Sequence, residues 1–167
     1  MQAGTPSSKL EFSPLLDVGR HLMSLAELRR LCVDRFPLSK TRPQIIAGLE
    51  KVIDKLHKNG IEGEVWINGS FLTEKMNPED VDLVLRITAE FYENCTEEQR
   101  KTVDWLNSNL KELYSCHSYL LMEWPKGHSQ YWIGQYYHSY WMRQFGFSRG
   151  NEMKGIAVIA LQGGWHD

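Results

Sequence analysis

The segment VWINGSFLTEKMNPEDVDLVL, residues 65–85, contains two short apolar runs joined by a connection with turn-forming residues. The first run, residues 64–68, is rich in β-forming residues and lies between two glycines, which predicts a strand. The second run, residues 80–87, is apolar at every odd position, so these side chains would share one face of a second strand. The segment therefore predicts a strand, a sharp turn, a short connection and another strand.

The rest of the chain alternates helical and extended patterns around this segment. Capping boxes at 24–27 and 96–99 are typical of helix starts, and each helix is expected to continue while its apolar spacing lasts. The helices expected on these grounds cover residues 24–36, 41–59, 96–113 and 131–145, and two further strands cover 117–124 and 155–161. The order predicts an α/β (α+β) fold in which helices flank a mixed β-sheet. Residues 1–23 show no clear periodicity and are interpreted as an N-terminal lead-in to a single domain at 24–167.

Composition limits the class of protein. The 167 residues carry 19 Lys and Arg against 21 Asp and Glu, a net charge of −2, which fits one globular domain and excludes a disordered chain. A dedicated nucleic-acid binder would carry a basic excess. There is no apolar run long enough for a membrane span, no signal-peptide pattern, and no metal or disulfide spacing among three cysteines. We therefore expect a reduced, soluble, cytoplasmic protein.

The turn and the second strand carry the residues suited to phosphate chemistry. Gly69 permits a sharp turn and a close approach, and Ser70 offers a hydroxyl and backbone N–H groups to a phosphate. Asp80 and Asp82 are two residues apart on a strand, so both carboxylates point to one face. Paired carboxylates together with substrate phosphates are the ligands that Mg²⁺ prefers. The alternative is that these are ordinary turn residues and a solvent-facing strand edge.

Gly69-Ser70 followed by Asp80-Val-Asp82, each attached to an apolar strand, resembles the signature of the nucleotidyltransferase superfamily with a DNA polymerase beta-like palm. The wider segment, about residues 22–88 and including Arg42, resembles a small bacterial family of nucleotidyltransferase-like proteins, with a weaker likeness near Lys154. The resemblance implies transfer of a nucleoside monophosphate from an NTP such as ATP, with Mg²⁺ or Mn²⁺ held by Asp80 and Asp82. It also implies a toxin–antitoxin or phage-defence setting, with a toxin or other neighbour-encoded protein as partner.

Active members of that superfamily place a third carboxylate on a later strand, and here residues 117–124 contain no Asp. If the position falls at the start of the strand, His117 or Ser118 has replaced the acid. If it falls near the end, Glu123 is the third acid, and we assign Glu123 on chemistry because a carboxylate is the harder Mg²⁺ ligand. By strand alternation His117 and Glu123 share one face about 20 Å apart, so only one of them can complete the site.

Several cations and aromatic side chains are secondary candidates. Lys75 and Lys154 are assigned to nucleotide binding because ammonium groups suit phosphate oxygens. Three arginines are further phosphate candidates: Arg42, Arg143 and Arg149. The aromatic stretch 131–145 suits stacking on a base or an RNA strand, and equally an amphipathic core or a partner surface.

Two functions from different classes follow. The first is an Mg²⁺-dependent nucleotidyltransferase that modifies a hydroxyl of a protein, an RNA or a small molecule. The second is a catalytically degenerate nucleotidyltransferase-fold module that acts through a protein partner. Retention of Asp80 and Asp82 favours the enzyme, and the absence of Asp from residues 117–124 favours the binding module.

Overall fold

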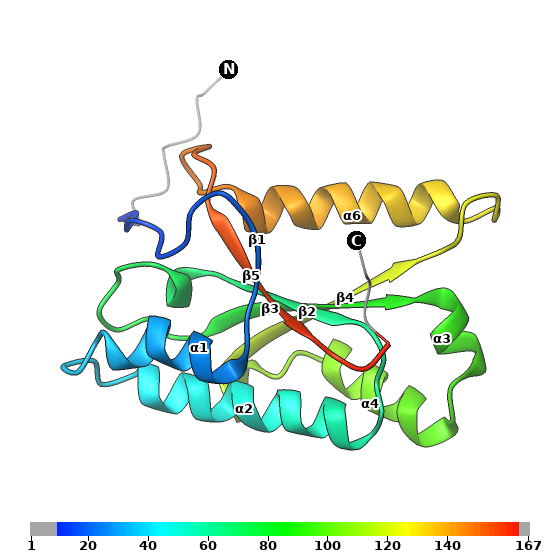
Figure 1. Ribbon diagram of the computed structural model, residues 1–167, viewed down its shortest axis with the longest axis horizontal. Coiled ribbons are helices and arrows are strands. Elements are labelled where there is room, and N and C mark those ends of the chain that lie inside the picture. The colour runs from blue at the N-terminus through cyan, green and yellow to red at the C-terminus, as the bar shows by residue number, and fades with distance from the viewer. Residues whose placement is uncertain (1–9, 164–167) are drawn as a thin grey trace.

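A computed structural model describes residues 10–163, and its centre is a five-stranded mixed sheet in the order β1-β5-β2-β3-β4 (Figure 1). Strand β2 is antiparallel to both of its neighbours, whereas β1 with β5 and β3 with β4 are parallel pairs. This mixed sheet with flanking helices confirms the predicted fold class. The strands are β1 (Gly19–Leu22), β2 (Glu64–Asn68), β3 (Val81–Thr88), β4 (Cys116–Glu123) and β5 (Gly155–Ala160).

The helices form two layers, one on each face of the sheet. Helix α6 lies along one face, and α1, α2 and α4 lie on the opposite side (Figure 1). The helices are α1 (Leu25–Arg29), the π-helical turn η1 (Arg30–Asp34), α2 (Arg42–Lys58), the 3-10 turn η2 (Ser70–Leu72), α3 (Ala89–Asn94), α4 (Glu97–Asn107), α5 (Lys111–Tyr114) and α6 (Tyr131–Gly146).

Strand alternation decides which residues of β3 and β4 face which helical layer. The odd positions of β3 are buried in the core on the α2 side, as their spacing predicts. Trp66 and Val84 instead join a smaller core that Phe145 of α6 covers. Asp82 lies on this α6 face of β3, and the in-register pairing of β4 puts His117 beside it. The α6 face therefore carries Asp82 and Arg86 of β3 and His117 and Glu123 of β4.

Local sequence signals set several helix ends. Both predicted capping boxes form, with Ser24 accepting from Glu27 and Thr96 accepting from Gln99. The N-cap of α2 is Thr41, which makes no side-chain capping bond; the hydroxyl of Ser39 instead accepts the backbone N–H of Arg42 at 3.2 Å. Two expected helices are shorter than predicted. The first changes to a π-helical turn after Arg29, and the region 96–113 is divided into α4 and α5.

The reading of residues 1–23 as lacking regular structure is wrong for its last part. Residues Gly19–Leu22 form β1, an edge strand that pairs with β5 from Gly19↔Gly155 to Leu22↔Val158. Four largely exposed residues show no alternating pattern, so only the pairing with β5 defines the strand. The part of the expected lead-in at residues 1–9 lies outside the described residues.

Across residues 10–163, helices that are long and apolar enough to pass through a bilayer are absent.

Candidate functional site

The two aspartates lie where β3 begins, next to the turn that ends β2. Asp82 is the second residue of β3 and pairs with Asn68, the last residue of β2. Asp80 immediately precedes β3, and its Oδ2 lies 3.1 Å from the Lys111 ammonium group of α5. Both aspartates therefore lie at the end of the sheet where β3 begins, close enough for the charge of Asp80 to act on Asp82.

Gly69 lets the Asp82 carboxylate sit directly against the turn. The backbone of Gly69 has a φ of +93°, and a Cβ built there would lie 2.4 Å from Asp82 Oδ2. A side chain at this position would therefore be strained and would displace the carboxylate. Ser70, the next residue, begins the 3-10 turn η2, which lies against β3. The sequence predicted that another group would approach the Gly69 backbone closely. In the structure that group is the Asp82 carboxylate.

Asn68 fixes the turn to two other elements. Its amide nitrogen donates to the backbone carbonyl of Phe145 in α6 and, at 3.0 Å, to that of Gly155 in β5. Its Oδ1 accepts the N–H of Gly69 at 2.8 Å. These contacts place the start of β5, and with it Lys154, beside the Gly69-Ser70 turn. Sequence reasoning missed Asn68, although its place directly before Gly-Ser was a usable signal.

The electrostatics of the pair suit a cation. Burial raises the pKa of the Asp82 carboxyl above its ordinary value, and the negative charge of Asp80 raises it further. The cationic charges that oppose this include Lys154 and Lys111. Burial in turn lowers the pKa of Lys154, with the Asp82 charge acting against that shift. A bound divalent cation would relieve the repulsion between the two carboxylates.

His117 occupies the position beside Asp82 on β4. The two residues are paired in the sheet, and His117 Nδ1 lies 3.6 Å from Asp82 Oδ1. Ser118, the other candidate at the strand's start, points to the opposite face. Its hydroxyl donates to the carbonyl of Leu106 at 2.6 Å and accepts the N–H of Leu110. Of the alternatives left open at the start of this strand, the structure therefore selects His117.

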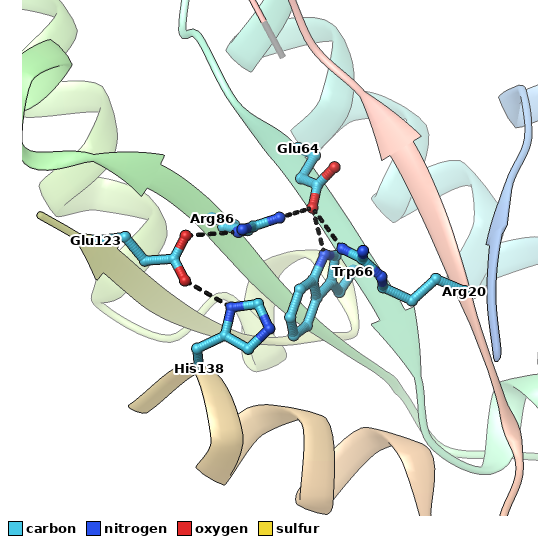
Figure 2. A network of polar contacts seen from close by, with 6 residues as sticks. All are labelled: Arg20, Glu64, Trp66, Arg86, Glu123 and His138. Atoms are coloured by element: carbon cyan, nitrogen blue, oxygen red, sulfur yellow. Dashed lines mark hydrogen bonds and ion pairs between the residues drawn. The ribbon is translucent and has the colours of Figure 1, made fainter. Parts of the chain in front are cut away.

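The assignment of Glu123 as third acid is corrected by the strand register. Glu123 pairs with Thr88, six residues along β3 from Asp82, which is about 20 Å in an extended strand. Both of its carboxylate oxygens are engaged where it lies. Oε2 accepts from Arg86 Nε at 2.8 Å, and Oε1 is 2.6 Å from His138 Nδ1 (Figure 2). Glu123 shares a face with His117, as alternation predicts, but at the other end of the sheet.

Glu123 belongs to a second polar cluster, which includes Arg86, Glu64, Trp66 and His138 (Figure 2). Arg86 bridges Glu123 to Glu64, whose Oε1 accepts from both Arg86 and the Trp66 indole at 2.8 Å. Burial would raise the pKa of Glu123, but the hydrogen bond with His138 and the charge of Arg86 outweigh it, so that pKa lies below its ordinary value. This cluster connects β2, β3 and β4 to α6.

Lys75 and Arg42 have contacts different from those expected. Arg42 is fully buried and donates to the backbone carbonyls of four residues. Its guanidinium therefore organises the connection after the Gly69-Ser70 turn, and the prediction that it contacts phosphate is wrong. Lys75 takes part through its backbone carbonyl, one of these acceptors. The four acceptors are the carbonyls of Cys32, Phe71, Thr73 and Lys75.

The remaining predicted residues are two arginines and the aromatic stretch. Arg143 donates a hydrogen bond to Asn151. Its guanidinium carbon Cζ lies 4.2 Å from the ring centroid of Phe147. Arg149 is exposed in the loop before Lys154. The positive charge of Arg149 contributes to lowering the pKa of Lys154. The aromatic stretch forms α6 as predicted, but much of it is exposed rather than core, with Trp132 at 77% and Tyr136 at 66%.

Sequence reasoning missed two residues next to the aspartates. Lys111 carried no signal, because its contact with Asp80 depends on how α5 packs beside β4. Tyr119 could have been found from its alternation with His117: its hydroxyl lies 2.9 Å from His117 Nε2. Across the described residues no cluster of three or more His, Cys, Asp or Glu side chains suits a metal ion. The protein's own ligands would thus be the two carboxylates, which fit Mg²⁺ when phosphate oxygens and water complete its shell.

The fold and the site together define an α/β protein with a paired carboxylate site beside a Gly-Ser turn. Residues 9–160 match the model of a family of unknown function, DUF6932. Because this match spans most of the chain, the protein belongs to that family. Neither the curated proteins nor the solved structures gave a match to the chain.

Proposed function

We propose that the protein is an Mg²⁺- or Mn²⁺-dependent nucleotidyltransferase that moves a nucleoside monophosphate from an NTP to a hydroxyl. The observation that carries the proposal is the placement of Asp80 and Asp82 at the start of β3, with the Asp82 carboxylate against Gly69. A carboxylate pair next to a Gly-Ser turn that offers a serine hydroxyl is suited to binding a metal-bound triphosphate.

Each residue has a distinct part in the proposed reaction. Asp80 and Asp82 would hold the divalent cation, which supplies charge neutralisation at the phosphates. Ser70 and the backbone at Gly69 would contact the phosphate oxygens. Lys154, held near Asp82 by the start of β5, would neutralise charge that develops on the leaving pyrophosphate. His117 is the imidazole nearest to the carboxylates and is placed to take the proton of the attacking hydroxyl.

The second candidate is a binding module of the same fold that retains nucleotide affinity without transfer. The observation in its favour is that His117, not a carboxylate, pairs with Asp82 on β4. Such a module would act through a protein partner, and a toxin or another neighbour-encoded protein is the partner proposed for either function. An RNA end remains a candidate acceptor for the enzyme.

Calorimetry tests the metal and nucleotide part of the proposal. We expect the protein to bind NTP only with Mg²⁺ or Mn²⁺, because two uncompensated carboxylates repel a triphosphate. Asp80→Asn/Asp82→Asn should abolish this metal-dependent binding, because it removes the carboxylate ligands of the metal ion. Asp54→Asn on α2 is the matched control, since Asp54 is 57% exposed and forms an ion pair with Lys58 on the same helix. Equal and metal-independent affinity in all three proteins would contradict the proposal.

Transfer is tested with α-labelled NTPs, either metal ion, and candidate proteins and RNAs as acceptors. Label that appears on an acceptor with the wild type and not with Asp80→Asn/Asp82→Asn supports the enzyme. Metal-dependent NTP binding without transfer to any acceptor supports the binding module instead.

A further inference from the structure

Tyr119 places a hydroxyl group beside the aspartate pair. It follows His117 by two residues on β4, so both side chains lie on the α6 face of the sheet. The Tyr119 hydroxyl oxygen is 2.9 Å from His117 Nε2 and 3.2 Å from Nδ1. His117 Nδ1 is in turn 3.6 Å from Asp82 Oδ1. The phenol, the imidazole and the carboxylate are therefore neighbours in one row.

The ring of Tyr119 is held in this position from both sides. Its centroid is 4.7 Å from the ring of His117 and 4.6 Å from that of Trp141 in α6. Trp141 packs on Phe145, which belongs to the core between α6 and the sheet. Two-sided packing limits the rotation of a half-buried ring, so the hydroxyl stays oriented toward His117. Packing alone would be served equally well by phenylalanine.

A hydroxyl held against an imidazole next to a metal-binding carboxylate has the position that an attacking group needs. Such a reaction gains most of its rate from keeping the nucleophile close to the reacting phosphorus in a fixed orientation. The imidazole is within hydrogen-bond distance of the proton to be removed. These features are supplied by the protein's own side chains, without an external acceptor.

We propose that Tyr119 is itself an acceptor, so that the protein nucleotidylates its own strand β4; this rests on the function proposed above. The Tyr119 oxygen forms a bond to the α-phosphorus of the NTP. The bond from that phosphorus to the oxygen bridging to the β-phosphorus breaks, and pyrophosphate leaves. The phenol proton passes to the His117 imidazole. The product is a phosphodiester between tyrosine and a nucleoside monophosphate, which then occupies the space beside Asp82 and prevents a second transfer to the same chain.

The test uses the full chain alone, incubated with each α-labelled NTP and Mg²⁺ or Mn²⁺. We expect intact-mass spectrometry to show a single added nucleoside monophosphate, located by peptide mapping on Tyr119, and no label from γ-labelled NTP. The label should survive acid, because a tyrosine phosphodiester is stable there, whereas a phosphoramidate on His117 is not.

Tyr119→Phe keeps the ring and removes only the hydroxyl, so it should lower self-labelling by at least about tenfold. Calorimetry should show that this variant still binds metal–NTP as the wild type does. Tyr137→Phe is the control, because Tyr137 is a 49% exposed residue of α6 whose ring packs against that of Tyr136, and it should label as the wild type does.

The outcomes separate this inference from the function on which it rests. Equal labelling of Tyr119→Phe, label mapped to another residue, or transfer to an added acceptor without self-labelling overturns the inference and leaves the proposed nucleotidyltransferase standing. Metal-dependent binding of NTP without any transfer overturns the inference and favours the binding module. Absence of both transfer and metal-dependent binding overturns both proposals.

Discussion

Asp82 carries its negative charge in an environment that disfavours it. The side chain is 32% exposed, and burial together with the neighbouring Asp80 raises the pKa of its carboxyl. The pKa in the folded protein is thus above that in the unfolded chain. Without a metal ion, the free energy of unfolding should increase as the pH falls through the folded-state pKa and stop increasing near the ordinary Asp value. A position that costs stability in the free protein is typical of a residue kept for binding.

Asp82→Asn should therefore stabilise the metal-free protein at neutral pH by about 1 kcal/mol and remove the pH dependence just described. The same variant should lose the stabilisation that Mg²⁺ and NTP together give to the wild type. Urea unfolding with and without these ligands measures both effects. A variant less stable than the wild type in the absence of ligand would show that Asp82 has a structural function instead.

Gly69 is the other residue on which the site's geometry depends. Gly69→Ala should destabilise the protein by about 1–3 kcal/mol and displace Asp82, with weaker metal-dependent NTP binding as the result. Gly127→Ala is the matched control, because Gly127 has the same φ of +93° but nothing within 4 Å of its Cβ position. Thermal unfolding and calorimetry on both variants separate backbone strain from contact with Asp82. Equal NTP binding by the two variants would contradict this account.

At the scale of secondary-structure elements, one arginine holds the connection between β2 and β3 in shape. Arg42, in the first turn of α2, donates to carbonyls at Phe71, Thr73 and Lys75, and lies 3.8 Å above the Phe36 ring. A connection with few regular hydrogen bonds needs other donors for its buried carbonyl groups. The Gly69-Ser70 turn thus keeps its position next to Asp82 partly because of a side chain from another element.

Arg42→Met should lower the free energy of unfolding by about 3–5 kcal/mol, because it leaves several buried carbonyl groups without donors. Arg29→Met, which removes the half-exposed ion pair between Arg29 and Glu50, should cost no more than about 1 kcal/mol. Chemical denaturation of the two variants provides the measurement. Similar losses of stability in the two variants would mean that the hydrogen bonds of buried Arg42 contribute no more to the free energy of unfolding than the half-exposed ion pair of Arg29.

On the scale of the whole molecule, two polar clusters lie at opposite ends of the same sheet face. Asp82 and His117 lie at one end, Arg86 and Glu123 lie at the other, and the core around Trp66 separates them. Helix α6 contacts both, through the pair of Trp141 with Tyr119 near the aspartates and through His138 at Glu123. The Glu123 cluster therefore holds one part of α6, the helix whose Trp141 packs on Tyr119, while the aspartates carry the proposed chemistry.

Glu123→Gln should affect the stability of the fold without affecting the proposed chemistry at the aspartates. Because the Glu123 pKa is lowered in the folded protein, its contribution to stability is present above the ordinary Glu pKa and lost as the pH falls through the folded-state value. The variant should be less stable by about 3–5 kcal/mol at neutral pH and lack this acid dependence. Its transfer or NTP binding per folded molecule should be unchanged. If the variant folded but lost transfer activity, Glu123 would have to be part of the active site, contrary to this account.

The sequence by itself determined the features that depend on neighbours along the chain. Alternation from Val81 to Ile87 set the buried face of β3, and the capping boxes at Ser24 and Thr96 set two helix starts. The Gly69-Ser70 turn also follows from local geometry. Side-chain direction in a strand and hydrogen bonding at a helix end are fixed within a few residues, so both can be read from the order of residue types.

Only the tertiary structure decided the features that join distant segments. The strand β1 exists through its pairing with β5, and Arg42 is buried because the connection after β2 folds over it. The choice of His117 over Glu123 depends on the register between β3 and β4, which the chain between them does not encode locally. Alternation gives the face of a strand but not its offset against a partner. That offset is set by packing of α4 and α5 on one side and α6 on the other.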